Sequence, residues 1–288
     1  MTTRFHRLSA NGLEHHVRDT SPDAAGDGEA VLLLHGFPDD HTVWDALTPV
    51  LIKAGYRVIA PDMRGFGETG MAASVAAYDL TKGALPDMVG VLDHLAVQQA
   101  HLVGHDFGAS AAWLLAAQYP DRFKSLSALS VGHPRAFLQA RKDPEQMRMS
   151  FYILQHQFRG LCEWAYRRRD WAWFKAHWDR HCDMEGAIAR LSRPGRLTAG
   201  LNWYRANAGI DRMLSPPKPG STGEERVNIP VLGVWSEEDK YLGEAQMLAS
   251  ADFVDASWRY ERLDGLGHWL QAEAPDRLAP LLLEHWQA

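Results

Sequence analysis

The stretch Gly104-His105-Asp106-Phe107-Gly108-Ala109 separates a short apolar run from a helical pattern over residues 109–119. Small residues flank Asp106 and allow a strand and the helix after it to approach closely, as in a nucleophile elbow. A carboxylate at the tip of such a turn, with a pKa of about 3.9, is ionised at pH 7 and can attack a saturated carbon to form an ester. The alternative interpretation is a Gly-rich strand–helix turn with an incidental acidic residue, which also suits the helix dipole.

Buried-strand patterns recur on both sides of this turn. Short apolar runs are typical of parallel strands, because both faces of a parallel sheet are covered. Such runs occupy residues 31–34, 57–60, 100–103, 125–131, 229–235 and 258–263, and helical patterns occupy 79–95, 109–119 and 275–286. The alternation predicts an α/β fold, with a mostly parallel sheet, right-handed crossovers and flanking helices.

The alternation stops after residue 134. Residues 135–213 contain no strand-like run and crowd aromatic with charged side chains, which predicts several helices inserted as a cap. Residues 215–223 have the Pro, Gly and Ser content of a loop. We therefore expect an all-helical cap domain of residues 135–215 and a core domain of residues 1–134 and 216–288.

The composition excludes several classes of protein. The chain has 288 residues, 46% hydrophobic and 23% charged, which is ordinary globular usage and excludes disorder. A net charge of −6 with mostly scattered basic residues predicts no nucleic-acid partner. Cys162 and Cys182 form neither a disulfide framework nor a zinc site, and no stretch is typical of a signal peptide or a membrane span. We expect a soluble, cytoplasmic protein.

Two residues in the last third are candidates to complete a triad with Asp106. His268 follows the last expected strand, where the histidine belongs when the chain order is nucleophile, acid, histidine. A pKa of about 6.5 suits a base that activates water at neutral pH. Asp239 follows the preceding strand, where an acid would hold the imidazole in the right tautomer. Glu237 and Glu238 lie beside it, but its register four residues past the strand favours Asp239.

Backbone donors are expected after the first core strand. The tetrapeptide His35-Gly36-Phe37-Pro38 stands there. The N–H groups of Phe37 and Phe107 could together bind the oxyanion that forms when water attacks an ester. Gly36 allows a close backbone approach and Pro38 restricts the turn. The same tetrapeptide could also be only a turn.

Several motifs follow one another in a fixed order. They are HGFP (35–38), PDMRGFGETG (61–70), GHDFGA (104–109), NWYRAN (202–207), an acidic residue after a strand, and GHW (267–269). In this order and spacing, the chain resembles the epoxide hydrolases of the α/β-hydrolase family. The resemblance implies an α/β-hydrolase fold with a helical cap, Asp106 as nucleophile, Asp239 as acid, His268 as base, and Phe37 and Phe107 as oxyanion donors. It also implies hydrolysis of an apolar epoxide to a vicinal diol through an alkyl-enzyme ester, without cofactor or metal.

The same family carries two cap tyrosines that hydrogen-bond the epoxide oxygen. Tyr204, within NWYRAN, matches one motif, and Tyr152, eight residues before Gly160, matches the position of the other. Ring opening makes an alkoxide, and a phenol with a pKa of about 10 stays protonated at pH 7 and can donate to it.

The segment after Tyr152 departs from the family pattern. The family reads toward Phe-Gln-x-Pro-Gly, whereas Arg159 stands here in place of the proline. Tyr152 could therefore be a core tyrosine instead. His156 or Tyr166 could enter the same pocket.

Two alternative functions stay open. Haloalkane dehalogenases resemble this chain but carry Trp after the nucleophile and a polar residue after the His-Gly pair, where Phe107 and Phe37 stand here. Fluoroacetate dehalogenases place Arg after the nucleophile and a His-Trp pair in the cap, where this chain has Phe107 and Phe151-Tyr152. A halide needs N–H donors and no proton, so these dehalogenases are disfavoured. The non-enzyme alternative is a hydrolase-like small-molecule binding protein, and we expect a monomer or homodimer.

Other polar and aromatic groups are interpreted as structural. His177 and His181 lack the glutamate of an HExxH motif and are expected on a helix surface, with no metal. Asp62 is expected to brace its loop. The tryptophans of residues 164–178 are expected in the core of the cap, and the arginines of residues 167–169 on its solvated face.

Overall fold

The computed structural model describes residues 1–22, 28–141, 143–209 and 226–287 of the chain. They contain an eight-stranded sheet with the strand order β1-β2-β4-β3-β5-β6-β7-β8. The strands are β1 (Thr2–Ala10), β2 (Leu13–Ser21), β3 (Ala30–Leu34), β4 (Arg57–Pro61), β5 (Ala100–His105), β6 (Phe123–Leu129), β7 (Val231–Ser236) and β8 (Trp258–Leu263). The predicted α/β fold is confirmed.

The sheet is parallel except at one edge. Strands β4, β3, β5, β6, β7 and β8 pair in parallel, whereas β2 is antiparallel to both β1 and β4. The six expected strands correspond to β3 through β8. The sequence did not predict β1 and β2, because most side chains of β1 are exposed or half-buried and the strand lacks an apolar run. A strand at the edge of a sheet needs no apolar run, because it is partly exposed to solvent.

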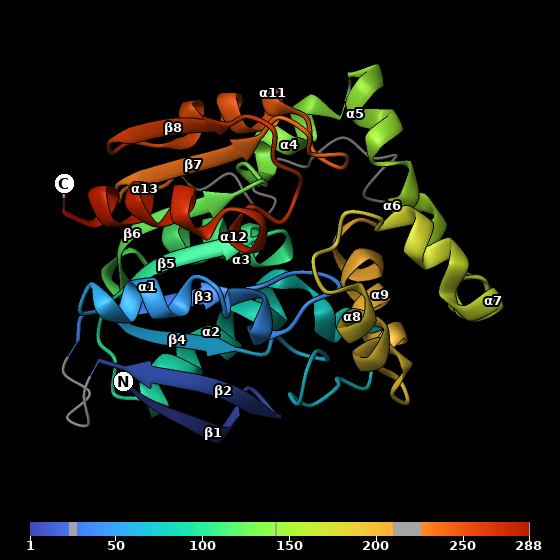
Figure 1. Ribbon diagram of the computed structural model, residues 1–288, viewed down its shortest axis with the longest axis horizontal. Coiled ribbons are helices and arrows are strands. Elements are labelled where there is room, and N and C mark those ends of the chain that lie inside the picture. Colours follow the sequence, from blue (N-terminus) through green and yellow to red (C-terminus); the bar gives the residue numbers. More distant parts are fainter. Residues whose placement is uncertain (23–27, 142, 210–225, 288) are drawn as a thin grey trace.

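Alternate side chains of the strands pack under helices on the two faces. Leu32 and Leu34 of β3 belong to the core covered by α2 and α3, whereas Val31 and Leu33 belong to the core covered by α1 and α13. Figure 1 shows α1 and α13 in front of the sheet. The helices of this layer structure are α1 (Thr48–Lys53), α2 (Leu85–His94), α3 (Phe107–Gln118), α11 (Glu244–Leu248), α12 (Leu270–Glu273) and α13 (Pro275–Gln287), with short helical turns η1 (His41–Trp44), η2 (Val75–Tyr78), η3 (Leu80–Ala84), η4 (Pro120–Arg122) and η5 (Ala249–Phe253).

A helical insertion lies between β6 and β7, and it contains no strand within residues 134–209. Figure 1 places α8 and α9 beyond the carboxyl ends of the parallel strands. The insertion comprises α4 (Pro134–Ala140), α5 (Pro144–Met149), α6 (Phe151–His156), α7 (Leu161–His177), α8 (Met184–Ser192) and α9 (Arg196–Asn207). The expected loop at 215–223 and the domain boundary at residue 215 lie outside the described residues.

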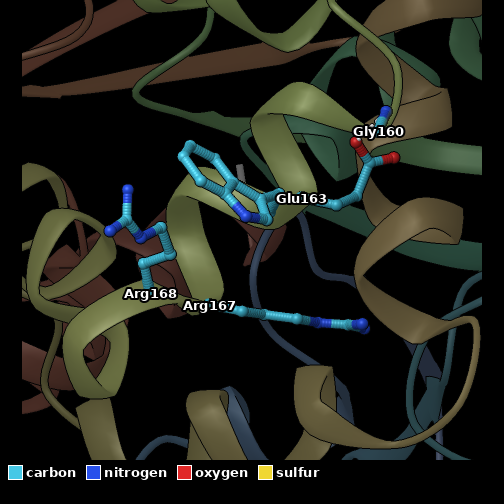
Figure 2. Close-up of a pocket in the computed structure, with 5 residues that line it drawn as sticks. Gly160, Glu163, Arg167 and Arg168 are labelled. Carbon is cyan, nitrogen blue, oxygen red and sulfur yellow. Dashed lines mark hydrogen bonds between the residues drawn. The ribbon is translucent and has the colours of Figure 1, made fainter.

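Helix α7 is interrupted near its middle. Arg168 has an extended ψ of 151°, and the next three residues have positive φ values of 50°, 52° and 60°. Trp164, before the interruption, is exposed, so its predicted place in the core of the insertion is wrong, whereas Trp178 is buried. A shallow pocket on the outside of α7 is lined by Gly160, Glu163, Trp164, Arg167 and Arg168 (Figure 2).

None of the described helices is both long and apolar enough to cross a membrane. Cys162 is buried and Cys182 is exposed, and both are free thiols.

Candidate active site

Asp106 lies at the sharp turn between β5 and α3. Its backbone has φ 53° and ψ −122°, a left-handed conformation that is uncommon for a residue with a side chain. Gly108 makes this turn possible, because a Cβ at that position would lie 2.0 Å from the carbonyl oxygen of Leu34 in β3. The helix therefore starts in direct contact with the neighbouring strand. This is the strained strand–helix turn that the glycine spacing predicts.

Two backbone N–H groups hold the Asp106 carboxylate. The Phe37 N–H donates to Asp106 Oδ1 at 2.9 Å, and the Phe107 N–H donates to the same carboxylate. Burial raises the pKa of Asp106, although His268 and the two N–H groups oppose the shift. The loop after β3 and the first turn of α3 thus converge on one carboxylate. Their N–H groups point at an oxygen of this carboxyl group and can stabilise a negative charge on it.

His268 and Asp239 form a close pair beside Asp106. His268 Nδ1 donates to Asp239 Oδ2 at 2.7 Å, which leaves His268 Nε2 at 3.9 Å from Asp106 Oδ2. Asp239 Oδ1 accepts from the N–H groups of Tyr241 and Leu242 at 2.8 Å and 3.1 Å. Burial alone would lower the pKa of His268, but Asp239, together with Asp106 and Asp39, more than offsets this effect, so the pKa is raised. The imidazole is therefore oriented, with one nitrogen directed at the candidate nucleophile.

The competing acids of the same loop face elsewhere. Glu237 pairs with Arg262 at 2.8 Å, and Glu238 pairs with Arg180. Both carboxylates are exposed, whereas the side chain of Asp239 is fully buried. Asp239 is the only one of the three that contacts the histidine.

Two tyrosines of the insertion lie opposite the Asp106 turn. Tyr152 of α6 and Tyr204 of α9 are buried, their ring centroids are 5.7 Å apart, and their hydroxyl groups are hydrogen-bonded. The ring of Tyr204 lies 4.7 Å from that of Phe107 and 5.6 Å from that of Phe37. Burial raises the pKa of both phenols well above the usual value, and the Asp106 carboxylate raises it further. Both phenols therefore stay protonated beside the carboxylate.

The residues of the atypical segment after Tyr152 pack against these tyrosines. The His156 ring is buried 4.4 Å from that of Tyr204 and 5.3 Å from that of Tyr152. Its Nε2 shares a 2.7 Å hydrogen bond with the Tyr166 hydroxyl. Burial lowers the pKa of His156 well below its usual value, so the ring is neutral. His156 contacts both tyrosines directly, and Tyr166 lies behind it.

Asp39 is a buried charge that the sequence did not single out. Asp39 Oδ1 accepts from His181 Nε2 at 2.8 Å, and Asp39 Oδ2 accepts from Trp269 Nε1 at 3.0 Å. Burial raises the pKa of Asp39, but the neighbouring histidines, His181 first and then His105 and His35, outweigh this effect and the pKa falls to about 2. His181 Nδ1 accepts from the N–H of Asp183, so the ring proton lies on Nε2.

The expected helix-surface position of His181 is therefore wrong, since this side chain is buried after the end of α7. His177 is the last residue of α7, and burial lowers its pKa to about 4. The signal for the missed charge was the Asp-Asp pair after His35-Gly36-Phe37-Pro38, since an acid next to a tight buried turn requires a partner.

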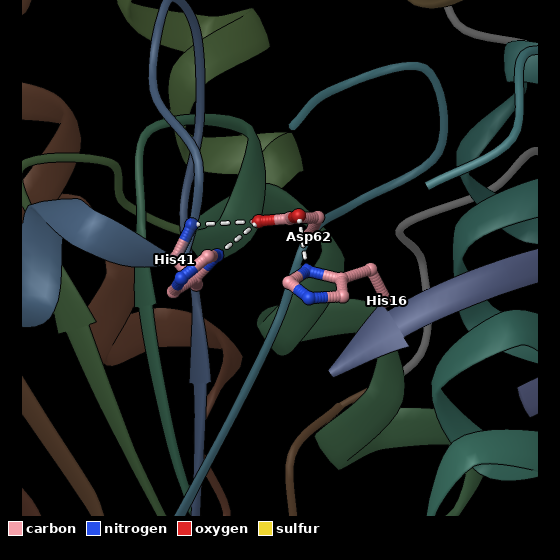
Figure 3. A group of neighbouring side chains, drawn as sticks. All are labelled: His16, His41 and Asp62. Carbon is pink, nitrogen blue, oxygen red and sulfur yellow. Dashed lines mark hydrogen bonds and ion pairs between the residues drawn. The ribbon is translucent and has the colours of Figure 1, made fainter. Parts of the chain in front are cut away.

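A cluster of His16, His41 and Asp62 has the residue types of a metal site (Figure 3). His16 Nδ1 lies 2.9 Å from Asp62 Oδ2, and His41 Nδ1 lies 2.6 Å from Asp62 Oδ1. These are hydrogen-bond distances, and ligands around one ion at about 2.0 Å each would stand farther apart. The carboxylate also accepts from the N–H groups of His41 and Glu68. Asp62 thus braces its loop, as predicted.

Comparisons with known proteins show which family the chain resembles. Residues 29–275 match the family model described as the alpha/beta hydrolase fold. Epoxide hydrolase A of Mycobacterium tuberculosis is 30% identical, over 96% of this chain and 95% of that protein. An epoxide hydrolase of Caballeronia sordidicola is 31% identical, over 96% of this chain and 91% of that protein.

A solved structure of an epoxide hydrolase from metagenomes of hot environments has a TM-score of 0.84 at 26% identity, covering 100% of this chain and 99% of that one. The resemblance drawn from the motifs is confirmed. The chain belongs to the α/β-hydrolase fold family, where it is a hydrolase of the epoxide hydrolase branch.

Proposed function

We propose that this chain hydrolyses epoxides to vicinal diols through an alkyl ester on Asp106. The observation that carries the proposal is the convergence of three groups: the half-buried Asp106 carboxylate, the His268–Asp239 pair, and the hydroxyls of Tyr152 and Tyr204. We further propose that α4 through α9 form a cap domain over a core domain. The two tyrosines support this division, because they come from the insertion while the other groups come from the sheet.

In the first step the Asp106 carboxylate attacks an epoxide carbon. A C–O bond forms to the carboxyl oxygen while the ring C–O bond breaks and its electrons move to the epoxide oxygen. This developing alkoxide takes a proton from Tyr152 or Tyr204, whose raised pKa keeps them protonated until then. Asp106 Oδ2 is the attacking atom that we favour, since Oδ1 is engaged by the Phe37 N–H.

In the second step water hydrolyses the ester. His268 Nε2 takes a proton from the water, and the resulting hydroxide attacks the Asp106 carboxyl carbon. The N–H groups of Phe37 and Phe107 stabilise the oxyanion, and Asp239 stabilises the protonated imidazole. Collapse breaks the bond to the alkyl oxygen and leaves Asp106 as a carboxylic acid. The alkyl oxygen takes the acid proton and leaves as the diol, which restores the Asp106 carboxylate, and the imidazolium proton neutralises the tyrosinate through solvent.

Ester formation changes the charge that these groups experience. The Asp106 carboxylate is one of the causes that raise the pKa of Tyr152, Tyr204 and His268. Esterification neutralises this carboxylate, so all three pKa values fall as the ester forms. The phenols then become better proton donors as the alkoxide appears. His268 also becomes easier to keep neutral, which the second step requires.

The experiment is to trap the ester. His268→Gln should form it and fail to hydrolyse it, so intact-protein mass should rise by the mass of one substrate molecule, with the added mass on the peptide that contains Asp106. The exposed-histidine variant His94→Gln is the matched control and should show diol formation without a stable adduct. A panel of terminal, styrene-type and fatty epoxides is assayed alongside alkyl halides. Halide release without any epoxide adduct would contradict the proposal and support a dehalogenase.

A further inference from the structure

Large apolar side chains are exposed together on one part of the helical insertion. Each is between 53% and 60% exposed, although side chains of this kind are usually buried. They lie on α5, on α6, on α7 and in the turn before α7, along an outer edge of the molecule (Figure 1). We call them the apolar face: Met147, Phe151, Phe158, Leu161 and Trp164.

The five residues are close together along the chain. Met147 on α5 and Phe151 on α6 stand on either side of Ser150, and Leu161 and Trp164 are three residues apart on α7. The N–H of Cys162 donates to the carbonyl of Phe158 at 3.0 Å, which holds Phe158 beside the first turn of α7, although Gly160 between them has a φ of 74°. Residues three and four apart share one side of a helix. Leu161 and Trp164 therefore share one side of α7, and the other members of the apolar face precede them on α5, on α6 and in the turn before α7.

Arginines surround this face. The segment of residues 144–170 contains five arginines and three acidic residues, whereas the whole chain has a net charge of −6. Glu163 is neutralised by Arg205 at 2.9 Å, and Asp170 is paired with Lys175 at 2.6 Å. The five arginines are all exposed and, among the described residues, none of them is within ion-pair distance of a carboxylate: Arg148, Arg159, Arg167, Arg168 and Arg169.

The pocket on α7 joins the two kinds of side chain. The guanidinium of Arg168 lies 4.4 Å from the centre of the Trp164 ring, a cation–π contact. Figure 2 shows the Arg167 and Arg168 side chains extending in different directions from α7. One cationic group thus lies over an exposed indole, and a second extends from the same part of α7.

We propose that the apolar face docks on the surface of an anionic lipid bilayer. Tryptophan and arginine are the side chains that favour the boundary between acyl chains and headgroups, and exposed Phe, Leu and Met side chains can enter that boundary. Unpaired arginines on an otherwise acidic protein are complementary to anionic headgroups. A second copy of the chain fits less well, because a two-fold contact through this face would bring its arginines against those of the other copy.

Docking would bring the candidate active site to the bilayer. Phe151 directly precedes Tyr152 on α6, so the apolar face and one proton donor share a two-turn helix. Apolar epoxides concentrate in lipid, so the enzyme would receive substrate from there. This consequence rests on the proposed function, whereas the docking itself does not.

The test is sedimentation of the full chain with vesicles. We expect binding to vesicles that contain phosphatidylglycerol, weaker binding at high salt, and little binding to phosphatidylcholine alone. Trp164→Ser should weaken binding about tenfold, and Arg167→Gln should weaken it about fivefold, because each removes one interfacial contact. Leu248→Ser on α11, which is also an exposed apolar side chain, is the matched control and should bind as the unmodified chain does.

Several outcomes would overturn the proposal. They are absence of binding to the anionic vesicles, equal binding by Trp164→Ser, or a dimer in vesicle-free buffer that the same substitution dissociates. Hydrolysis of a small soluble epoxide without vesicles should be unchanged in both variants. Loss of vesicle binding with intact hydrolysis supports docking. Sedimentation tests the docking and hydrolysis tests the proposed chemistry, so the two can fail separately.

Discussion

Gly36 lies directly against the candidate nucleophile. A Cβ added at Gly36 would stand 2.1 Å from Asp106 Oδ1 and 2.4 Å from Asp106 Cβ. Ordinary van der Waals contact begins at 3.4 Å, so a Gly36→Ala substitution leaves the carboxyl oxygen about 1.3 Å too close. The backbone of Asp106 is held between β5 and α3, so the clash must be relieved by displacing its carboxyl group.

The expected loss follows from that displacement. A reacting group that is misplaced by about 1 Å loses about 100-fold in rate. Moving Oδ1 also disturbs its 2.9 Å contact with the Phe37 N–H, and losing one oxyanion donor costs about 100- to 1,000-fold. We expect Gly36→Ala to slow ester formation in single-turnover experiments by about 100-fold or more.

The control is a glycine with room for a methyl group. A Cβ at Gly70 would meet its nearest neighbour, the carbonyl oxygen of Glu14, at 3.4 Å. Gly70→Ala should therefore retain its rate. Circular dichroism and thermal unfolding of both variants separate a displaced carboxylate from a lost fold. If folded Gly36→Ala keeps kcat/KM within about threefold of the unmodified enzyme, Asp106 is not the nucleophile in the position described here.

Four further substitutions test the site and the surrounding fold. Tyr204→Phe and Tyr152→Phe should each lower the rate of epoxide opening by about 100-fold or more, since each removes a proton donor. Rapid-quench kinetics measure this rate, and unchanged rates in both variants would exclude the tyrosines as proton donors. Asp239→Asn should lower the pKa of His268, because Asp239 contributes most to raising it, and should move the acid limb of the ester-hydrolysis rate to lower pH; an unmoved limb would contradict the pairing. Burial lowers the pKa of His101 to about 4, so the folded protein resists protonation of this ring. The free energy of unfolding is therefore highest above about pH 6.5 and falls by about 1.4 kcal/mol per pH unit between about pH 6.5 and about pH 4. His101→Gln should flatten this pH dependence, measured by urea unfolding.

Sequence reasoning succeeded where local chemistry is distinctive. The apolar runs predicted β3 through β8, and the spacing of glycines around Asp106 predicted the sharp turn. The register of Asp239 selected it from three neighbouring acids, and the structure brings it to His268. The edge strand β1 and its neighbour β2 escaped prediction, because a half-exposed strand carries polar side chains that are also common in loops.

The insertion shows what periodicity cannot predict. Trp164 and Trp178 are fourteen residues apart, a spacing that returns to nearly the same side of an unbroken helix. The interruption of α7 rotates its second half, so that one indole is exposed and the other is buried 5.4 Å from the Phe37 ring. No residue type marks this interruption in the sequence. The buried position of His181 depends on the same geometry.

Asp39 has a consequence for chimeric enzymes. Asp39 lies in the loop after β3. Its carboxylate binds His181 of the insertion and Trp269 of the loop that carries His268, so it joins three separate segments. Exchanging the insertion for one without a donor at position 181 would strand a buried charge, at a cost of about 3–5 kcal/mol. Recombination of related insertions with this sheet should therefore keep a hydrogen-bond donor at position 181 opposite Asp39.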